Sequence, residues 1–408
     1  MTPTQRPSPL SPALLAILCG VVAALHIGKM PPALPVLRDA LGVTLVQAGF
    51  LLSMVQAAGM LGGALLGLAA DGWGLRRSLL TGLCLLSVAS FGGMAAQAPH
   101  HLLALRALEG LGFLLVVLPA PSLVRQLVPP AQLARHLGLW GAYMPTGTAV
   151  ALLAAPAAMA VVGWQGLWGG LGALSAGMAV WAWRAIPPDA QRALAQPAAA
   201  ATPTDTWAQR LRLTLTSRGP WLVAVAFALY SSQWLAVVGF LPSVYAQTGL
   251  SGPVAGALTA LVCAVNISGN VGAGHLLHRH WPPQRLLAVG FVAMGVTAWL
   301  TFSPLTAHTP VLRYAACLAF SALGGLVPGT LFSLAVRVAP NERTVSTTVG
   351  WIQQCSATGQ FAGPPLVAWL AAQAGGWHLT WLATGTASLL GLGLVGLLAA
   401  HPAVKKQE

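Results

Sequence analysis

Charged residues are scarce in this chain. Asp, Glu, Lys and Arg make up 7% of its 408 residues, and only 7 positions are acidic, whereas a soluble domain is about one-quarter charged. Hydrophobic residues reach 56%, so a water-soluble globule of this composition would precipitate. Twelve apolar runs, each able to form a spanning helix of about 20 residues, fill nearly the whole sequence. We therefore expect an all-α integral membrane protein with twelve transmembrane helices and no room for a soluble catalytic domain.

Sequence signals for metal binding or hydrolysis are also missing. Neither His-Glu-x-x-His nor Gly-x-Ser-x-Gly occurs, and His275, His278 and His280 are explained more simply by a basic loop than by a metal site. The cysteines lie inside predicted spans and lack disulfide or zinc spacing, which indicates small core residues. They are Cys19, Cys84, Cys263, Cys317 and Cys355. We expect no enzyme activity, no cofactor and no metal.

Positive charge predominates, and its distribution indicates the orientation. The net charge is +13, with 20 Lys and Arg residues, and most of these fall in alternate loops and near both termini. Cytoplasmic loops of membrane proteins accumulate Lys and Arg. We therefore expect both termini in the cytoplasm, the chain in the inner (plasma) membrane, and a lipid bilayer rather than nucleic acid as its surroundings.

One polar segment divides the chain. Residues 187–220 are rich in Ala, Pro, Thr, Gln and Arg and lack an apolar period, which is typical of a flexible linker. We expect an N-terminal six-helix bundle at 1–186, a cytoplasmic linker at 187–220, and a C-terminal six-helix bundle with a short cytoplasmic tail at 221–408.

The two halves repeat one another. With a shift of 207 residues, Leu34-Pro35 falls on Leu241-Pro242 and Leu105-Arg106 falls on Leu312-Arg313. Several glycines match in the same order, which exceeds what a shared apolar composition would give. Repeated six-helix halves are typical of secondary transporters with a central site between the halves.

A short polar motif interrupts the apolar runs between spans 2 and 3. It reads Gly67-x-x-x-Asp71-x-x-Gly74-x-Arg76-Arg77, and a partial copy in the second half reads Gly274-x-x-x-His278-Arg279. Glycine permits a tight turn, and Asp71 can accept hydrogen bonds from a helix N-terminus. Together with the spans, the repeat and the linker, the motif resembles the gating loop of the major facilitator superfamily. The alternative is a plain positively charged loop.

Other stretches loosely resemble the cyanate and nitroimidazole transporter group of that superfamily. They are Gly239-Phe-Leu-Pro-Ser-Val-Tyr245 with Thr248-Gly-Leu-Ser251, and Gly138-Leu-Trp-Gly141. This resemblance implies a small anionic or weakly polar substrate.

A few ionisable and polar residues lie inside predicted spans, where such groups are costly and usually functional. The resemblance implies that spans 1, 4, 7 and 10 line a central cavity. Those spans carry His26 and Lys29, Arg106 and Glu109, Gln233 and Trp234, and Arg313. A spacing of three puts each charged pair on one helix face. Cations outnumber the acid, so such a cavity would be electropositive and favour an anion.

Each of these side chains also has a structural interpretation. Lys29 can extend to the outer interface, and Arg106 with Glu109 can form an ion pair within one helix. Arg313 can serve as an interfacial anchor, and His26 can be a neutral packed histidine.

The leading functional hypothesis is a proton-coupled secondary transporter, moving a small anionic or polar solute by alternating access as a monomer. Arg106 and Lys29 would hold the anion with Gln233, Trp234 and Arg313, and Glu109 or His26 would carry the proton. The alternative is a drug/proton efflux antiporter. Span 5 has Ala151-Leu152 where efflux proteins of the superfamily have Gly-Pro, which counts against it.

Overall fold

The computed structural model describes residues 11–63, 73–129, 132, 136, 139–189, 206–250, 252–341 and 344–401. Every regular element in these ranges is a helix, and ten are long and apolar enough to cross a membrane. One of the ten includes α9 (Tyr143–Ala185), which comprises two helices that meet at Gly163, where φ is +70°. Helix α17 (Val345–Ala374) is not among the ten, but its 30 residues are also long enough to span a membrane. With α9 counted twice, the predicted twelve-helix membrane fold is confirmed.

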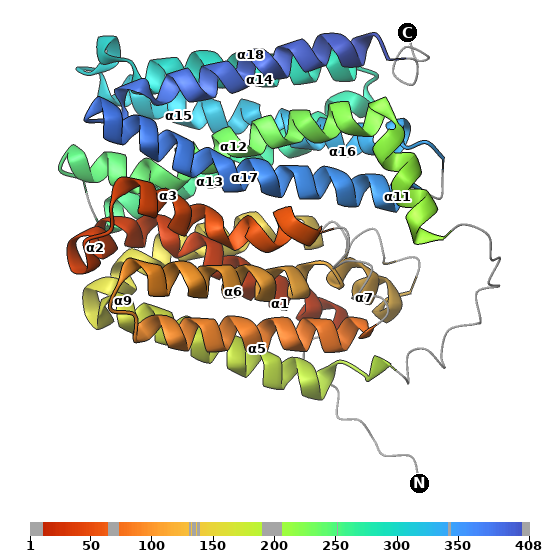
Figure 1. Cartoon of the computed structure of the whole chain (residues 1–408), viewed down its shortest axis with the longest axis horizontal. Coiled ribbons are helices and arrows are strands. Elements are labelled where there is room, and N and C mark those ends of the chain that lie inside the picture. The colour runs from red at the N-terminus through yellow and green to blue at the C-terminus, as the bar shows by residue number, and fades with distance from the viewer. Residues whose placement is uncertain are drawn as a thin grey trace.

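The first half of the chain forms one bundle, in red to yellow in Figure 1. Span 1 breaks into two helices, and span 2 contains a 3-10 turn. The elements are α1 (Pro12–Gly28), α2 (Met30–Leu41), α3 (Leu45–Ser53), η1 (Met54–Gln56), α5 (Leu75–Met94), α6 (Pro99–Val117), α7 (Ala120–Leu127) and α9.

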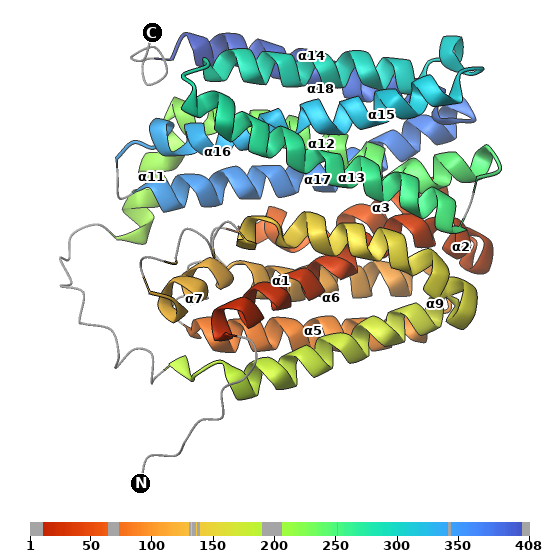
Figure 2. The same ribbon diagram turned by 180° about the vertical axis from the view of Figure 1, so that it is seen from behind.

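The second half forms a bundle beside the first, as Figures 1 and 2 show from opposite sides. In both views α2 and α11 lie at opposite ends of the molecule. The elements are α11 (Trp207–Thr216), α12 (Arg218–Gln247), α13 (Gly252–His278), α14 (Pro283–Phe302), η2 (Pro304–Thr306), α15 (Pro310–Gly324), α16 (Leu326–Val338), α17, η4 (Trp377–Leu379) and α18 (Thr380–Ala399).

The segment 187–220, expected to be a flexible linker, contains helix α11 (Trp207–Thr216) near its C-terminal end. Helix α11 begins with a capping box, in which Thr206 accepts from the backbone of Gln209 and the Gln209 side chain accepts from the backbone of Thr206. This reciprocal pair satisfies two otherwise unpaired N–H groups. Helix α12 then begins at Arg218, so residues 207–216 of the predicted linker form a helix of their own.

Helices from the two halves meet along a seam between the second span and α17. A Cβ placed on Gly49 would lie 2.7 Å from Cα of Pro365, so this close approach requires glycine. Further along, Gln56 Nε2 donates to Gln360 Oε1 at 3.0 Å, and Gln354 Nε2 donates to the Met60 carbonyl at 2.9 Å. The seam therefore combines backbone contact with two hydrogen bonds between the halves.

Replacing Gly49 by alanine is expected to destabilise the protein. The new methyl group meets the backbone of α17, which cannot yield without separating the halves, and overpacking of this kind costs about 1–3 kcal/mol. Gly63→Ala is the matched control, because its Cβ would lie 3.8 Å from Gln354 Cβ, an ordinary contact. Thermal unfolding in detergent should show a lower Tm for Gly49→Ala only. Equal Tm values for both variants would contradict a close approach of the two halves at Gly49.

Candidate functional site

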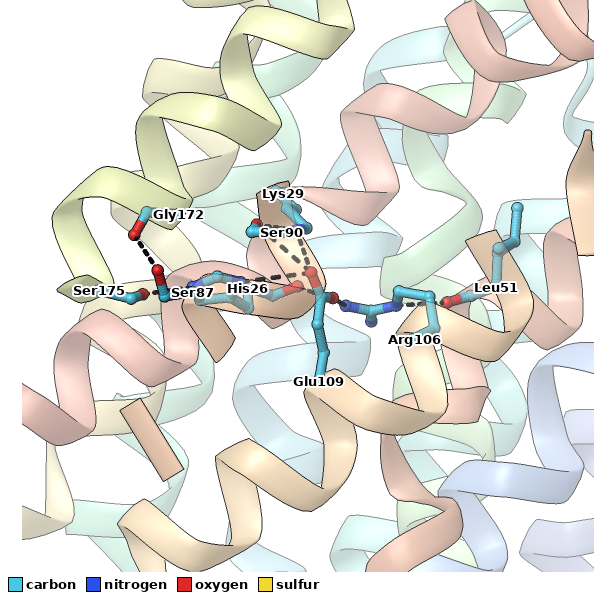
Figure 3. Close-up of polar contacts among 9 residues, drawn as sticks. All are labelled: His26, Lys29, Leu51, Ser87, Ser90, Arg106, Glu109, Gly172 and Ser175. Carbon is cyan, nitrogen blue, oxygen red and sulfur yellow. Dashed lines mark hydrogen bonds and ion pairs between the residues drawn. The ribbon is translucent and has the colours of Figure 1, made fainter. Parts of the chain in front are cut away.

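Span 1 breaks at Lys29, between α1 and α2. Pro31 and Pro32 have no N–H group, so the carbonyls of Ile27 and Gly28 lose their helical hydrogen bonds. The Lys29 N–H still bonds to the Leu25 carbonyl at 2.9 Å. The break therefore places Lys29 at the junction of two helices, with its side chain directed into the bundle (Figure 3).

Glu109 of α6 lies at the centre of a buried charged cluster. Its Oε1 accepts from Lys29 Nζ at 2.5 Å, and its Oε2 accepts from Arg106 Nη1 at 2.6 Å. Ser90 Oγ and His26 Nδ1 each lie 3.5 Å from Oε1. One carboxylate thus receives one cation from its own helix and one from span 1, and Figure 3 shows these side chains converging.

Arg106 connects three spans through its guanidinium. Its Nε donates to the Leu51 carbonyl of α3 at 3.0 Å, and its Nη1 also donates to the His26 carbonyl of α1 at 2.7 Å. Within the described ranges its Nη2 is buried without a hydrogen-bond partner. A buried donor without an acceptor costs free energy. Arg106 Nη2 can therefore still donate a hydrogen bond to one more acceptor.

The remaining contacts attach the cluster to the outer helices of the same bundle. Lys29 Nζ donates to Ser90 Oγ of α5 at 3.1 Å and lies 4.3 Å from the centroid of the Trp168 ring of α9. His26 Nε2 lies 2.9 Å from Ser175 Oγ, also on α9. The cluster therefore bonds α1, α5, α6 and α9 together.

Burial separates this cluster from solvent. His26 and Lys29 are 0% exposed, and Arg106 and Glu109 are 1% exposed. The Lys29 side chain is buried inside the bundle. The Arg106–Glu109 ion pair lies within α6, and Lys29 of span 1 adds a second cation to it. Two cations surround one carboxylate in this closed site, so with a neutral His26 it carries one excess positive charge.

The other residues expected at a central cavity lie elsewhere. Gln233 of α12 donates to the Leu229 carbonyl at 3.0 Å and accepts from Ser388 Oγ of α18 at 2.9 Å. The contact from Gln233 to the twelfth span parallels that from His26 to the sixth. Trp234 Nε1 donates to Ser321 Oγ of α15 at 3.1 Å.

Arg313 lies near the start of α15 and is half-buried. Its Nη2 donates to the Ser303 carbonyl at 2.6 Å and its Nε donates to Thr306 Oγ1 at 3.2 Å. These bonds tie the α14–α15 connection to the helix. The side chain occupies the repeat position of Arg106 but makes local contacts instead of joining a charged cluster.

The gating motif is described only in part. Gly67 and Asp71 lie outside the described residues. Gly74 has φ +110°, and the backbone N–H groups of Arg76 and Arg77 donate to Asp189 Oδ1 and Oδ2 at 3.0 and 3.3 Å.

Asp189, at the start of the predicted linker, therefore caps the N-terminus of α5. The sequence pattern gave no signal for this role, because the acid lies more than a hundred residues away in a polar segment. In the second copy, Gly274, His278 and Arg279 are exposed at the end of α13.

Substituting Asp189 by alanine is expected to lower stability by about 1 kcal/mol, the usual effect of losing an N-terminal cap. Two N–H groups at the start of α5 would lose their acceptor. Asp189→Asn keeps one acceptor oxygen and should lose less. Melting temperatures in detergent check this order of stability. An alanine variant as stable as the wild type would show that the Asp189 cap does not stabilise the protein.

A chain of polar contacts runs from α12 to the seam between the halves. The spacing of these residues in the sequence did not predict it. Ser231 Oγ lies 2.7 Å from Ser356 Oγ, and Gln360 Nε2 donates to Ser356 Oγ at 3.3 Å. Since Gln360 accepts from Gln56, this chain runs from α12 through α17 to η1. The partners lie far apart in sequence, so only the folded structure brings them together.

The chain thus folds into two helical bundles that span the membrane, and the first of them encloses a buried charged cluster. The sequence profile of the Major Facilitator Superfamily matches residues 16–359, so the chain belongs to this superfamily of transporters. A comparison with curated proteins gave no match.

Several solved transporter structures share the fold. A bacterial homologue of the human lysosomal transporter Spinster, inward-facing and unoccupied, has a TM-score of 0.78 at 15% identity, covering 97% of this chain and 98% of that one. The D-xylose–proton symporter has a TM-score of 0.74 at 16% identity over 97% and 98%. The nucleoside transporter NupG has a TM-score of 0.77 at 13% identity over 95% and 99%.

Proposed function

We propose that this transporter is proton-coupled and moves a small anionic or polar solute by alternating access. The observation that supports this most directly is Glu109, held at 2.5 and 2.6 Å by Lys29 and Arg106 from two spans. A carboxylate shared by two cations is a site where one proton changes the balance of charge.

The excess of cations favours an anionic substrate. When Glu109 is ionised, it forms ion pairs with both Lys29 and Arg106. When it is protonated, the two cations lose their buried counter-ion, which is unfavourable unless another anion approaches. Proton binding and anion binding would therefore support each other, with Arg106 and Lys29 attracting the anion and Glu109, assisted by His26, carrying the proton.

Gln233 and Trp234 are proposed as polar contacts for the solute from the second half, and Arg313 as positive charge at the end of α15. The loop residues Gly67, Asp71, Gly74, Arg76 and Arg77, with Gly274, His278 and Arg279, are proposed to gate the cycle. We further propose a monomer in the inner membrane with cytoplasmic termini, since the arginine-rich loops favour that side. The likeness to cyanate and nitroimidazole transporters supports a small substrate.

A ligand panel tests the substrate class. Ligands that bind the folded state raise the melting temperature, so purified protein would be heated with cyanate, nitrite, short carboxylates, aromatic acids, neutral nitroimidazoles or lipophilic cations. We expect a shift with at least one anion and no shift with that anion in Arg106→Gln. Shifts with lipophilic cations alone would contradict an anion transporter.

One observation favours drug/proton efflux as a second candidate. An apolar groove of about 500 Å³ runs between α12, α17 and α18, with Gln233 in its lining. Lipophilic compounds suit such a groove. In the same panel, lipophilic cations that stabilise the wild type but not Ala387→Trp, which fills the groove, would support efflux.

A further inference from the structure

A second groove lies at the end of the molecule where α11 meets α12. It encloses about 640 Å³ between the start of α12 and the end of α18. Its lining combines the apolar residues Trp221, Leu222 and Leu397, which we call the walls, with the polar residues Ser217, Arg218 and His401, which we call the mouth. Figure 1 shows α11 and the end of α18 at the same end of the bundle. The lining of the groove thus contains both apolar and basic side chains.

The walls expose apolar side chains on the outside of the bundle. Leu397 is 58% exposed and Trp221 is 41% exposed, and both lie near the ends of spanning helices. Trp221 is held in place, because its Nε1 donates to the Leu215 carbonyl at 2.8 Å and its ring packs edge-on against Trp351 with centroids 4.7 Å apart. Tryptophan in this position is typical of the membrane–water boundary.

The mouth is complementary to negative charge. Arg218 is exposed, and His401 Nε2 lies 3.2 Å from where a Cβ of Gly219 would be, so the ring lies against the first turn of α12. Ser217 Oγ donates to the Leu213 carbonyl at 2.7 Å and gives that turn no side-chain cap. The N-terminus of a helix favours an anion, and no acid is among the described residues that line this groove.

We propose that this groove binds an anionic phospholipid, with its phosphate at Arg218 and His401 and an acyl chain along Leu222 and Leu397. Basic pockets between spans at a membrane surface suit such headgroups. A free phosphate would contact the mouth alone and leave the apolar walls exposed. The lipid satisfies both parts of the groove, and this site is independent of the transport cluster.

Native mass spectrometry of the full-length protein tests the proposal. Dioleoyl phosphatidylglycerol and dioleoyl phosphatidylcholine share their acyl chains and differ in net charge. We expect retention of phosphatidylglycerol to exceed that of phosphatidylcholine, with about a fivefold loss when Arg218→Gln removes one basic contact and a larger loss in Arg218→Gln/His401→Gln. Arg285→Gln is the control, because it removes an exposed arginine from the first turn of α14, which does not line this groove.

Two further arms separate a lipid site from a phosphate site. Dihexanoyl phosphatidylglycerol has the same headgroup but short chains and should bind more weakly, and excess inorganic phosphate should not displace the dioleoyl lipid. Displacement by phosphate, equal binding of the two dioleoyl lipids, or unchanged retention in the double variant would each overturn the proposal. Thermal unfolding of the double variant, compared with that of the wild type, checks that it remains folded.

Discussion

Replacing Glu109 by glutamine is expected to abolish proton-driven accumulation while leaving substrate exchange intact. Glutamine keeps the shape of the carboxyl group but cannot bind and release a proton, so it imitates a permanently protonated acid. The carrier would still change conformation with substrate bound, because Arg106 and Lys29 remain. Proteoliposomes distinguish the two activities, since accumulation requires an imposed pH gradient and exchange of labelled for unlabelled anion does not.

Glu109→Asp is the matched control for this experiment, because it retains a titratable carboxylate. It should keep measurable gradient-driven uptake. Accumulation by Glu109→Gln at the wild-type rate would exclude Glu109 as the proton carrier. Loss of exchange as well would show that the glutamine variant is inactive for another reason, and the second prediction deals with that outcome.

Removing the acid of this cluster is expected to lower the free energy of unfolding more than removing one of its cations. Glu109→Gln leaves Lys29 and Arg106 buried without a counter-ion, and breaking a buried ion pair from one side costs about 3–5 kcal/mol. Lys29→Met instead leaves Arg106 and Glu109 as a neutral pair at 2.6 Å, so its cost should be clearly smaller. Unfolding in detergent compares the two variants.

A double variant completes this cycle. In Lys29→Met/Glu109→Gln one cation is removed together with the acid, so part of the lost stability should return. A favourable interaction energy of this kind is what a double-mutant cycle measures between neighbours. Additive losses would contradict a direct charge interaction between Lys29 and Glu109.

The sequence was sufficient for the twelve helices, because in a bilayer each span must be apolar over a length set by the membrane. It was not sufficient where local polarity hides a helix. Helix α11 carries Arg210 and Arg212, and its capping box at Thr206 and Gln209 is the one local signal of its start. The junction of spans 5 and 6 is also tighter than a loop, since Gly163 alone provides the turn.

For the site, spacing indicated which residues share a face but not what that face meets. His26 and Lys29 both reach Glu109, yet their other contacts are Ser175, Ser90 and Trp168. A serine in an apolar span carries no recognisable signal, so the resemblance suggested a central cavity where the structure shows a closed cluster inside one bundle.

The pairing of distant helices was equally invisible. Asp189 caps α5 across 113 residues of sequence, and Gln56 meets Gln360 across 304. Such contacts depend on how the bundles pack, which residue type and periodicity do not encode.

Proton movement measured together with anion entry tests the central claim most directly. A pH-sensitive dye would be trapped in proteoliposomes at equal pH on both sides, and an anion that shifts the melting temperature would be added outside. Our account predicts acidification of the lumen with wild-type protein, none with Glu109→Gln, and acidification in proportion to anion entry. Anion entry by the wild type without any change in luminal pH would contradict proton coupling.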